Sequence, residues 1–165
     1  MTTSVTKDPR ASAARIAARS DIVDVRLVSV SAELVGQQKP GASLRFALEN
    51  HPTIEYEPGE TSFIVRVSYE LTIDQVAEGE KNESDAEGSP VAEIRCVQAG
   101  LFTLEMRDGD AELEQGELEA YAQTTGQFAL YPYARELFAS LTSRIGLPAL
   151  TLPAFRLAIQ VRDQT

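Results

Sequence analysis

Apolar and polar residues alternate with a period of two in several stretches of the chain, which is the pattern of half-buried β-strands. The clearest stretch runs from residue 63 to residue 73, and further ones cover residues 44–48 and 91–104. Cys96 shares the apolar parity of the last stretch, so we expect it to be a small buried side chain. In the clearest stretch the apolar set is Phe63, Val65, Val67, Tyr69, Leu71 and Ile73.

An earlier predicted strand, residues 22–34, changes phase along its length. Because alternate residues of a strand face opposite sides, this change predicts either a β-bulge or burial on both faces. The apolar residues occupy odd positions first and even positions afterwards. The odd set is Val23, Val25 and Leu27, and the even set is Val28, Val30 and Leu34.

Residues 50–60 contain two prolines and a glycine, so they are predicted to form an irregular connection. We interpret His51 as a loop residue there and not as a catalytic base. Ile54 and Tyr56 lie in the same connection and are unusual for a loop that only contacts water.

Near the N-terminus, Asp8 and Pro9 predict the start of a short helix over residues 9–20, with Asp8 as the N-cap and Pro9 in the first turn. This helix is rich in alanine and arginine. We expect its arginines to face solvent, namely Arg10, Arg15 and Arg19.

The second half of the chain changes to a helical period. Pro132 predicts the start of a helix and Gly146 its end, with Pro148 preventing continuation. Residues 147–165 are predicted to form extended chain and then a short helix over residues 154–162. The apolar stripe of the main helix is Ala134, Leu137, Phe138, Leu141 and Ile145.

Four strands followed by helices indicate an α+β fold with two layers, a four-stranded sheet packed against helices. The chain has 165 residues, which suits one domain. We expect an N-terminal tail and short helix over residues 1–20 and one domain over residues 21–165.

The composition leaves few routes to catalysis. One cysteine excludes an internal disulfide and a cysteine-based zinc site, and one histidine does not suffice for a multi-histidine metal centre. No phosphate-cradling glycine motif and no nucleophile elbow is present. We therefore predict that the protein is not an enzyme and uses no cofactor or metal.

The net charge of −10 argues against sequence-independent binding to nucleic acid or to an anionic membrane. No stretch approaches the roughly 18 consecutive apolar residues of a membrane-spanning helix, and the N-terminus lacks the apolar core of a secretory signal. We expect a cytoplasmic protein.

The acidic surplus is local. Residues 74–90 hold six acidic residues and one lysine, and residues 105–119 hold seven acidic residues and one arginine. Both stretches are polar and contain glycine, so we expect solvated carboxylates with a role in solubility. Calcium binding at residues 108–110 is a weaker alternative, because the alternating oxygen ligands of a dedicated loop are missing.

A set of motifs from residue 98 onward resembles the SecB chaperone family. Tyr131 stands where the family usually has phenylalanine. The composite pattern is specific, although each piece alone is weak. The motifs are Gln98–Phe102 (QAGLF), Tyr121–Phe128, Leu130–Glu136 (LYPYARE), Ser143-Arg144 and Pro148–Leu152.

The resemblance implies an antiparallel sheet with a long helix, assembling as a homotetramer that is a dimer of dimers. It also implies an ATP-independent holdase that binds unfolded client polypeptides through exposed apolar grooves and, in the Sec system, delivers precursors to SecA. A client groove would use Leu34, Phe46, Ile54, Tyr56, Tyr131, Phe155 and Leu157, and a subunit interface would use Val23, Val25, Leu137 and Leu141.

The chain departs from the family at the surface that docks SecA. Of the four positions that match it, only Glu93 is acidic, the others being Ser31, Val35 and Arg95. The N-terminal helix, Tyr131 and residues 124–131 are similar to SecB-like chaperones linked to toxin–antitoxin systems, which protect an antitoxin. SecA and an antitoxin are both candidate partners. The alternative function is a module of the same architecture that encloses a small apolar ligand.

Overall fold

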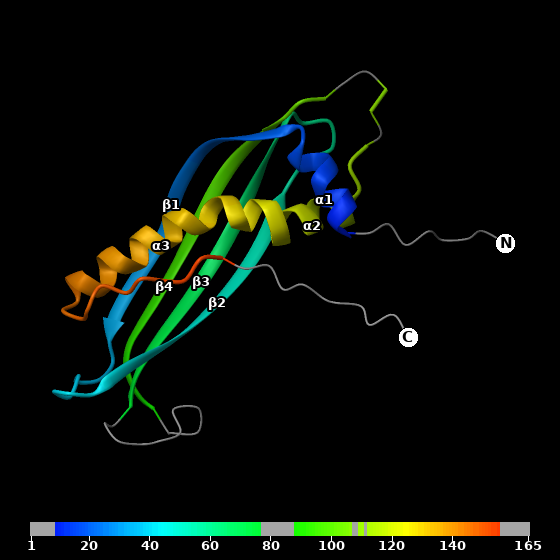
Figure 1. The fold of residues 1–165 in the computed structure, drawn as a ribbon. Coiled ribbons are helices and arrows are strands. Elements are labelled where there is room, and N and C mark those ends of the chain that lie inside the picture. The colour runs from blue at the N-terminus through cyan, green and yellow to red at the C-terminus, as the bar shows by residue number, and fades with distance from the viewer. Residues whose placement is uncertain (1–8, 77–87, 107–108, 111, 156–165) are drawn as a thin grey trace, which may run out of the picture.

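The structure is a computed structural model that describes residues 9–76, 88–106, 109–110 and 112–155. Its centre is a four-stranded antiparallel sheet with the strand order β1-β4-β3-β2, and the helices lie on one face of this sheet (Figure 1). The predicted α+β fold is confirmed. The strands are β1 (Ser20–Leu34), β2 (Ser43–Glu55), β3 (Ser62–Val76) and β4 (Ser89–Leu104).

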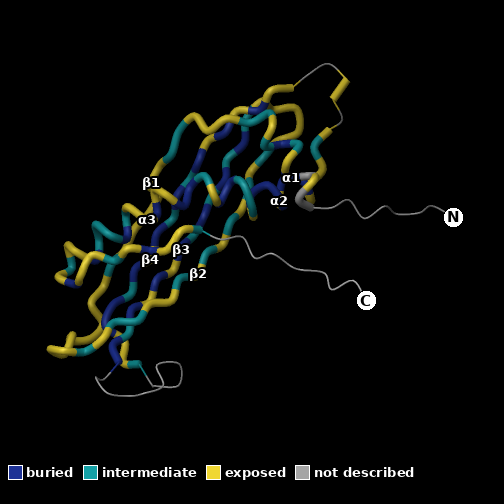
Figure 2. Tube along the Cα trace, viewed as in Figure 1, coloured by how far each residue is buried: buried dark blue, intermediate teal, exposed yellow. Residues whose placement is uncertain are grey.

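The two central strands carry the core, as the alternation predicts. In β3 every second residue from Phe63 to Ile73 is buried, and β4 buries Cys96 in the same layer (Figure 2). This inner face is the one that the helices cover. Burial raises the pKa of the Cys96 thiol to about 11, so the thiol stays protonated at neutral pH.

The phase change in β1 is resolved by bulges, which confirms one of the two predicted explanations. The register against β4 shifts between Ile22 and Asp24 and again between Leu27 and Ser29. The second shift leaves Val28 without a counterpart in β4. Consequently Leu27 and Val30 both lie on the inner face, although their parities differ.

The predicted connection over residues 50–60 is wrong in its first half, because β2 continues to Glu55. Pro52 lies within this strand, opposite Val67 of β3. An edge strand tolerates a proline, since only one of its sides pairs with a neighbour. His51 is therefore a strand residue and not a loop residue, with its Nε2 3.8 Å from a carboxylate oxygen of Glu49.

The long helix begins earlier than Pro132. The helix α2 (Gln115–Tyr121) leads through the π-helical segment η1 (Ala122–Gly126) into α3 (Gln127–Arg144), so Pro132 lies inside α3. Leu130 and Tyr131, just before the proline, are buried against the sheet. Their burial offsets the backbone hydrogen bond that proline cannot donate.

Two glycines let the helical layer approach the sheet. A Cβ atom on Gly100 of β4 would stand 2.9 Å from the Cδ2 atom of Leu130. A Cβ atom on Gly126 would stand 3.0 Å from a methyl group of Val65. The glycine in the QAGLF motif is thus required by the crossing of α3 over β4.

The predicted end of the main helix is confirmed. Gly146 has φ +85°, which favours glycine, and the Leu147 N–H donates to the carbonyl of Thr142 over 3.0 Å. The chain then runs extended and without regular structure up to Phe155, beside α3 (Figure 1). Most of the predicted terminal helix, residues 156–162, lies outside the described residues, and residues 154–155 are not helical.

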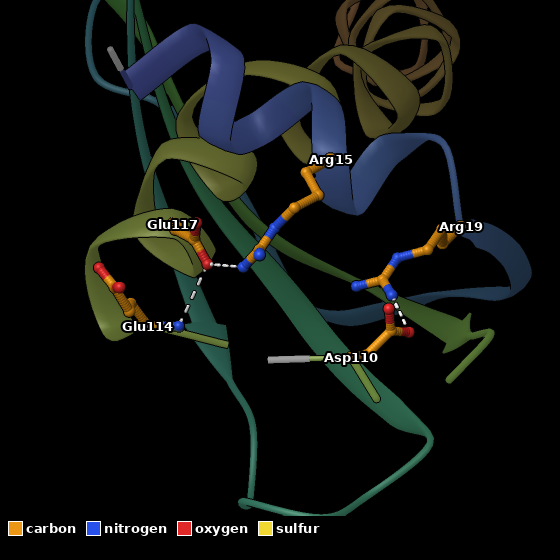
Figure 3. Close-up of polar contacts among 5 residues, drawn as sticks. All are labelled: Arg15, Arg19, Asp110, Glu114 and Glu117. Carbon is orange, nitrogen blue, oxygen red and sulfur yellow. Dashed lines mark hydrogen bonds and ion pairs between the residues drawn. The ribbon is translucent and has the colours of Figure 1, made fainter. Parts of the chain in front are cut away.

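The predicted N-terminal helix is present as α1 (Pro9–Ala17), but its arginines do not simply face solvent. Arg15 forms an ion pair with Glu117 of α2, and Arg19 forms one with Asp110 (Figure 3). Asp8 and the side chain of Arg10 lie outside the described residues.

The acidic stretch 105–119 is consequently not a uniformly solvated loop. Glu117 has only 3% of its side chain exposed, and it also accepts a hydrogen bond from the backbone N–H of Glu114 at the start of α2 (Figure 3). One carboxylate therefore caps α2 and attaches it to Arg15 of α1.

Candidate functional site

A cavity of about 500 Å³ lies between α3 and the extended C-terminal segment. We call it the helix groove. It is mainly apolar, with Arg135 and Glu136 at its margin. Its lining residues are Phe128, Tyr131, Pro132, Arg135, Glu136, Ala139, Thr151, Ala154 and Phe155.

Aromatic side chains from both walls meet in the helix groove. The rings of Tyr131 and Phe155 are 5.1 Å apart, and those of Phe128 and Phe155 are 6.3 Å apart. The Tyr131 hydroxyl donates a hydrogen bond of 2.7 Å to the carbonyl of Pro153. Burial raises the pKa of Tyr131, so the phenol keeps its proton and this bond at neutral pH.

A second cavity of about 280 Å³ lies between the β1–β2 connection and the chain that follows α3. We call it the loop groove. Thr151 lines both grooves, so the two cavities flank the same C-terminal segment. The lining residues are Gln38, Ala42, Leu44, Arg45, Phe46, Ile73, Leu147, Pro148, Ala149, Leu150 and Thr151.

The structure brings three of the predicted groove residues to these cavities. Tyr131 and Phe155 line the helix groove, and Phe46 lines the loop groove. Ile54 and Tyr56 are half-buried against the core and line neither cavity.

Two further predicted groove residues are placed elsewhere. Leu34 lies near the end of β1, at the opposite edge of the sheet from Phe46, and is 57% exposed. Leu157 lies outside the described residues.

Sequence reasoning missed Phe128 and the residues that follow α3. Phe128 is 59% exposed and precedes Tyr131 by one helical turn. The spacing between Phe128 and Tyr131 could have indicated a shared helix face. The predicted helix starts at Pro132, however, so neither residue was assigned to it. Leu147 and Leu150 belong to a segment without periodicity, so only the fold places them at a cavity.

A long apolar surface runs along β1. Of the predicted interface residues, Val23 is 59% exposed, while Val25, Leu137 and Leu141 are half-buried. The exposed side chains of this surface, of which those paired with β4 lie on the inner face, run along the whole strand. They are Ile22, Val23, Leu27, Val28, Val30, Leu34 and Val35.

The described residues offer apolar shape rather than reactive groups. Among them, no three His, Cys, Asp or Glu side chains lie close enough to hold a metal ion. Within the same ranges, no helix is long and apolar enough to cross a membrane. The two grooves can receive apolar side chains of a ligand, and the β1 surface can pack against another sheet or strand.

Comparison with known proteins identifies relatives and a solved structure that are all named SecB-like chaperones. Two proteins named SecB-like chaperone, MT2006 and Rv1957, from two strains of Mycobacterium tuberculosis, are each 41% identical to the chain over 143 residues. Each alignment covers 84% of this chain and 79% of the relative. No family model matches the chain.

The solved structure is the Mycobacterium tuberculosis Rv1957 SecB-like chaperone in complex with a ChAD peptide from the Rv1956 HigA1 antitoxin. It matches with a TM-score of 0.76 and 37% identity, and the match covers 90% of this chain and 99% of that chain.

Proposed function

Since the chain belongs to the SecB-like chaperone family, we propose that it holds unfolded client polypeptides in the helix groove and the loop groove, without ATP and in the cytoplasm. Its specific client is an antitoxin, which it protects from aggregation and proteolysis. Support for the client class comes from the solved relative, whose bound molecule is an antitoxin peptide.

The observation that carries the proposal is the pair of apolar grooves on either side of one extended segment. One buried leucine or phenylalanine contributes about 1.5–3 kcal/mol to binding. Micromolar affinity requires about 8 kcal/mol after ordering costs, so several anchors are needed. Two grooves that share Thr151 as a lining residue offer several anchor positions to a client peptide.

The proposal includes a homotetramer built through β1. A long edge strand with exposed apolar residues is prone to aggregation unless a partner covers it. The β1 surface has this character on its inner face, and Leu137 and Leu141 of α3 are half-buried. Repeated grooves in one assembly raise the effective concentration of anchors for a long client.

The four positions that match the family's SecA-docking surface include one acidic residue, Glu93, which favours an antitoxin over SecA as the partner. Arg95 of β4 lies 2.9 Å from a carboxylate oxygen of Glu93 and 3.8 Å from one of Glu70. The negative charge of Glu93, at a position that matches the family's SecA-docking surface, is thus partly neutralised by Arg95. Ser31 lies opposite Arg95 in β1 and adds no negative charge.

The test is suppression of aggregation of a denatured client by the purified protein without nucleotide. We expect near-stoichiometric suppression by the wild type. Phe46→Glu together with Phe155→Glu places one charge in each groove, and we expect it to weaken client binding at least tenfold with the native mass unchanged. Leu101→Glu is the matched control, because Leu101 and Phe46 are both 38% exposed and Leu101 lies on the opposite face of the sheet.

A lack of suppression by the wild type at several-fold excess contradicts the proposal. Equal client affinity in the groove variant removes the two cavities from the binding site. Co-purification of one defined small apolar molecule with a monomer that binds no client favours the ligand-binding alternative.

A further inference from the structure

The wall of the loop groove formed by the β1–β2 connection is attached to the sheet by one buried amide. Gln75 of β3 is 6% exposed. Its Nε2 donates to the carbonyl of Gln37 over 2.8 Å, and its Oε1 accepts from the N–H of Lys39 over 2.8 Å. The side chain thus satisfies two backbone groups of an irregular segment, as a neighbouring strand would.

The opposite wall is attached in a similar way. Thr142 of α3 is fully buried, and its Oγ1 accepts a hydrogen bond of 2.9 Å from the N–H of Leu150. The same hydroxyl donates to the carbonyl of Phe138 over 2.8 Å. Together with the bond from the Leu147 N–H to the Thr142 carbonyl, this fixes both ends of the segment 147–150.

We propose that Gln75 and Thr142 are positioning residues of the loop groove, which keep its two walls apart in the shape that receives an apolar client side chain. This inference rests on the proposed function. Gln38 lies between the two residues that Gln75 holds, and Pro148 and Ala149 lie between the two that Thr142 holds. Each side chain therefore controls residues that line the cavity, although neither lines it.

The physical reason is pre-organisation. Segments without helix or strand must be ordered before they can bind, and that cost lowers the apparent affinity. If release of one wall leaves about a tenth of the molecules with an open groove, the apparent Kd rises about tenfold. The segment after α3 also contributes Leu147 and Leu152 to the core, so the free energy of unfolding of each variant is measured beside its Kd.

The test uses variants that remove the bonds and keep the volume. Gln75→Met and Thr142→Val each abolish the side-chain hydrogen bonds, while Thr142→Ser keeps the hydroxyl. The readouts are the Kd of a fluorescent, extended peptide with leucine and phenylalanine side chains, and hydrogen exchange over residues 36–42 and 147–151. We expect Kd to rise about tenfold in the first two variants, with faster exchange in the corresponding wall, and Thr142→Ser to restore wild-type binding.

Gln98→Met is the matched control. Gln98 is 4% exposed on the same face of the sheet, and its Oε1 accepts no hydrogen bond from any described residue. We expect its peptide affinity to equal that of the wild type. An unchanged Kd in Gln75→Met and in Thr142→Val overturns the inference, and so does an equal loss in Gln98→Met. A wild type that binds no peptide overturns the proposed function itself.

Discussion

The two edge strands of the sheet, β1 and β2, differ in the side chains that they expose. In β2 the only large hydrophobic residue that is more than a third exposed is Phe46, which lines the loop groove. The outer face of β2 is polar, with Glu49, His51 and Glu55 alternating along it. The strand β1 instead exposes large apolar residues along its whole length, and those that pair with β4 lie on its inner face.

The difference indicates which edge is better suited to pair with a strand of another subunit. Charged side chains and Pro52 make β2 a poor template for pairing with another strand. The strand β1 also carries charges and two bulges, but its exposed apolar residues make it the better candidate for pairing with another subunit. The loop groove includes Phe46 of β2, so the proposed assembly surface and this proposed client groove lie at opposite edges of one sheet.

The largest expected effect comes from placing charges on β1. Leu27→Asp together with Val30→Asp puts two carboxylates on the inner face of the strand, where each residue is now nearly half exposed. Desolvating them at an interface costs several kcal/mol, so we expect self-association to weaken at least about a thousandfold. Native mass spectrometry should then give the mass of a monomer.

The matched control for this change is on the other edge. Ala47→Asp with Thr53→Asp places the same two charges on exposed positions of β2. We expect its native mass to equal that of the wild type. Dissociation by both double variants would mean that β2 also forms an interface.

An intermediate effect is expected at the start of β1, where α1 precedes the strand. Arg15→Met removes an ion pair of the Glu117 carboxylate, which has 3% of its side chain exposed. Because Arg15 itself is 37% exposed, we expect a loss of about 2 kcal/mol and not the full cost of a buried pair. Chemical denaturation measures the loss.

Arg26→Met is the control for that measurement. Its ion pair with Asp24 lies on the same strand but is exposed, with 81% of the Arg26 side chain accessible. We expect a change within about 0.5 kcal/mol. If Arg15→Met lowered the free energy of unfolding no more than Arg26→Met does, the ion pair between Arg15 and Glu117 would not stabilise the packing of α1.

The smallest expected effect concerns Cys96, which pairs with Val30 of β1. Its thiol has a pKa of about 11, above the ordinary value of 9.0. Its alkylation rate should therefore be low at pH 7 and still rise about tenfold per pH unit from pH 9 to pH 10, where an ordinary thiol levels off. The double β1 variant should keep this low reactivity, because β1 still pairs with β4 in the monomer. Rapid alkylation of the wild type at pH 7 would contradict the burial of this thiol.

The same pKa shift predicts a weak dependence of stability on alkaline pH. Folding favours the protonated thiol, so its contribution is fully present below pH 9 and is lost as the pH rises toward 11.

The strands could be predicted from the sequence where a short-range pattern decides them. The alternation from Phe63 to Ile73 predicts one buried face, and the phase change between Leu27 and Val28 leaves a bulge as one of two explanations, which the structure shows. The full length of β2 was not predictable in this way. Pro52 ends most strands, and only its place at the edge of the sheet permits it here.

The helices and the site depend more on contacts between distant residues. The burial of Glu117 arises from Arg15, about a hundred residues earlier, and no local signal marks it. Tyr131, Phe155 and Phe46 were predicted as groove residues from family resemblance. Gln75 and Thr142 were not predicted, because a polar residue in an apolar pattern gives no indication of which backbone groups it will satisfy.

The pairing of β1 with β4 also has a consequence for the synthesis of the protein. A ribosome adds about 5–20 residues per second, and β4 begins at Ser89, long after β1 ends at Leu34. For several seconds the most apolar edge of the nascent chain has neither its own partner strand nor a second subunit. A protein that shields unfolded chains therefore passes through an interval in which its own first strand is the segment that most needs shielding.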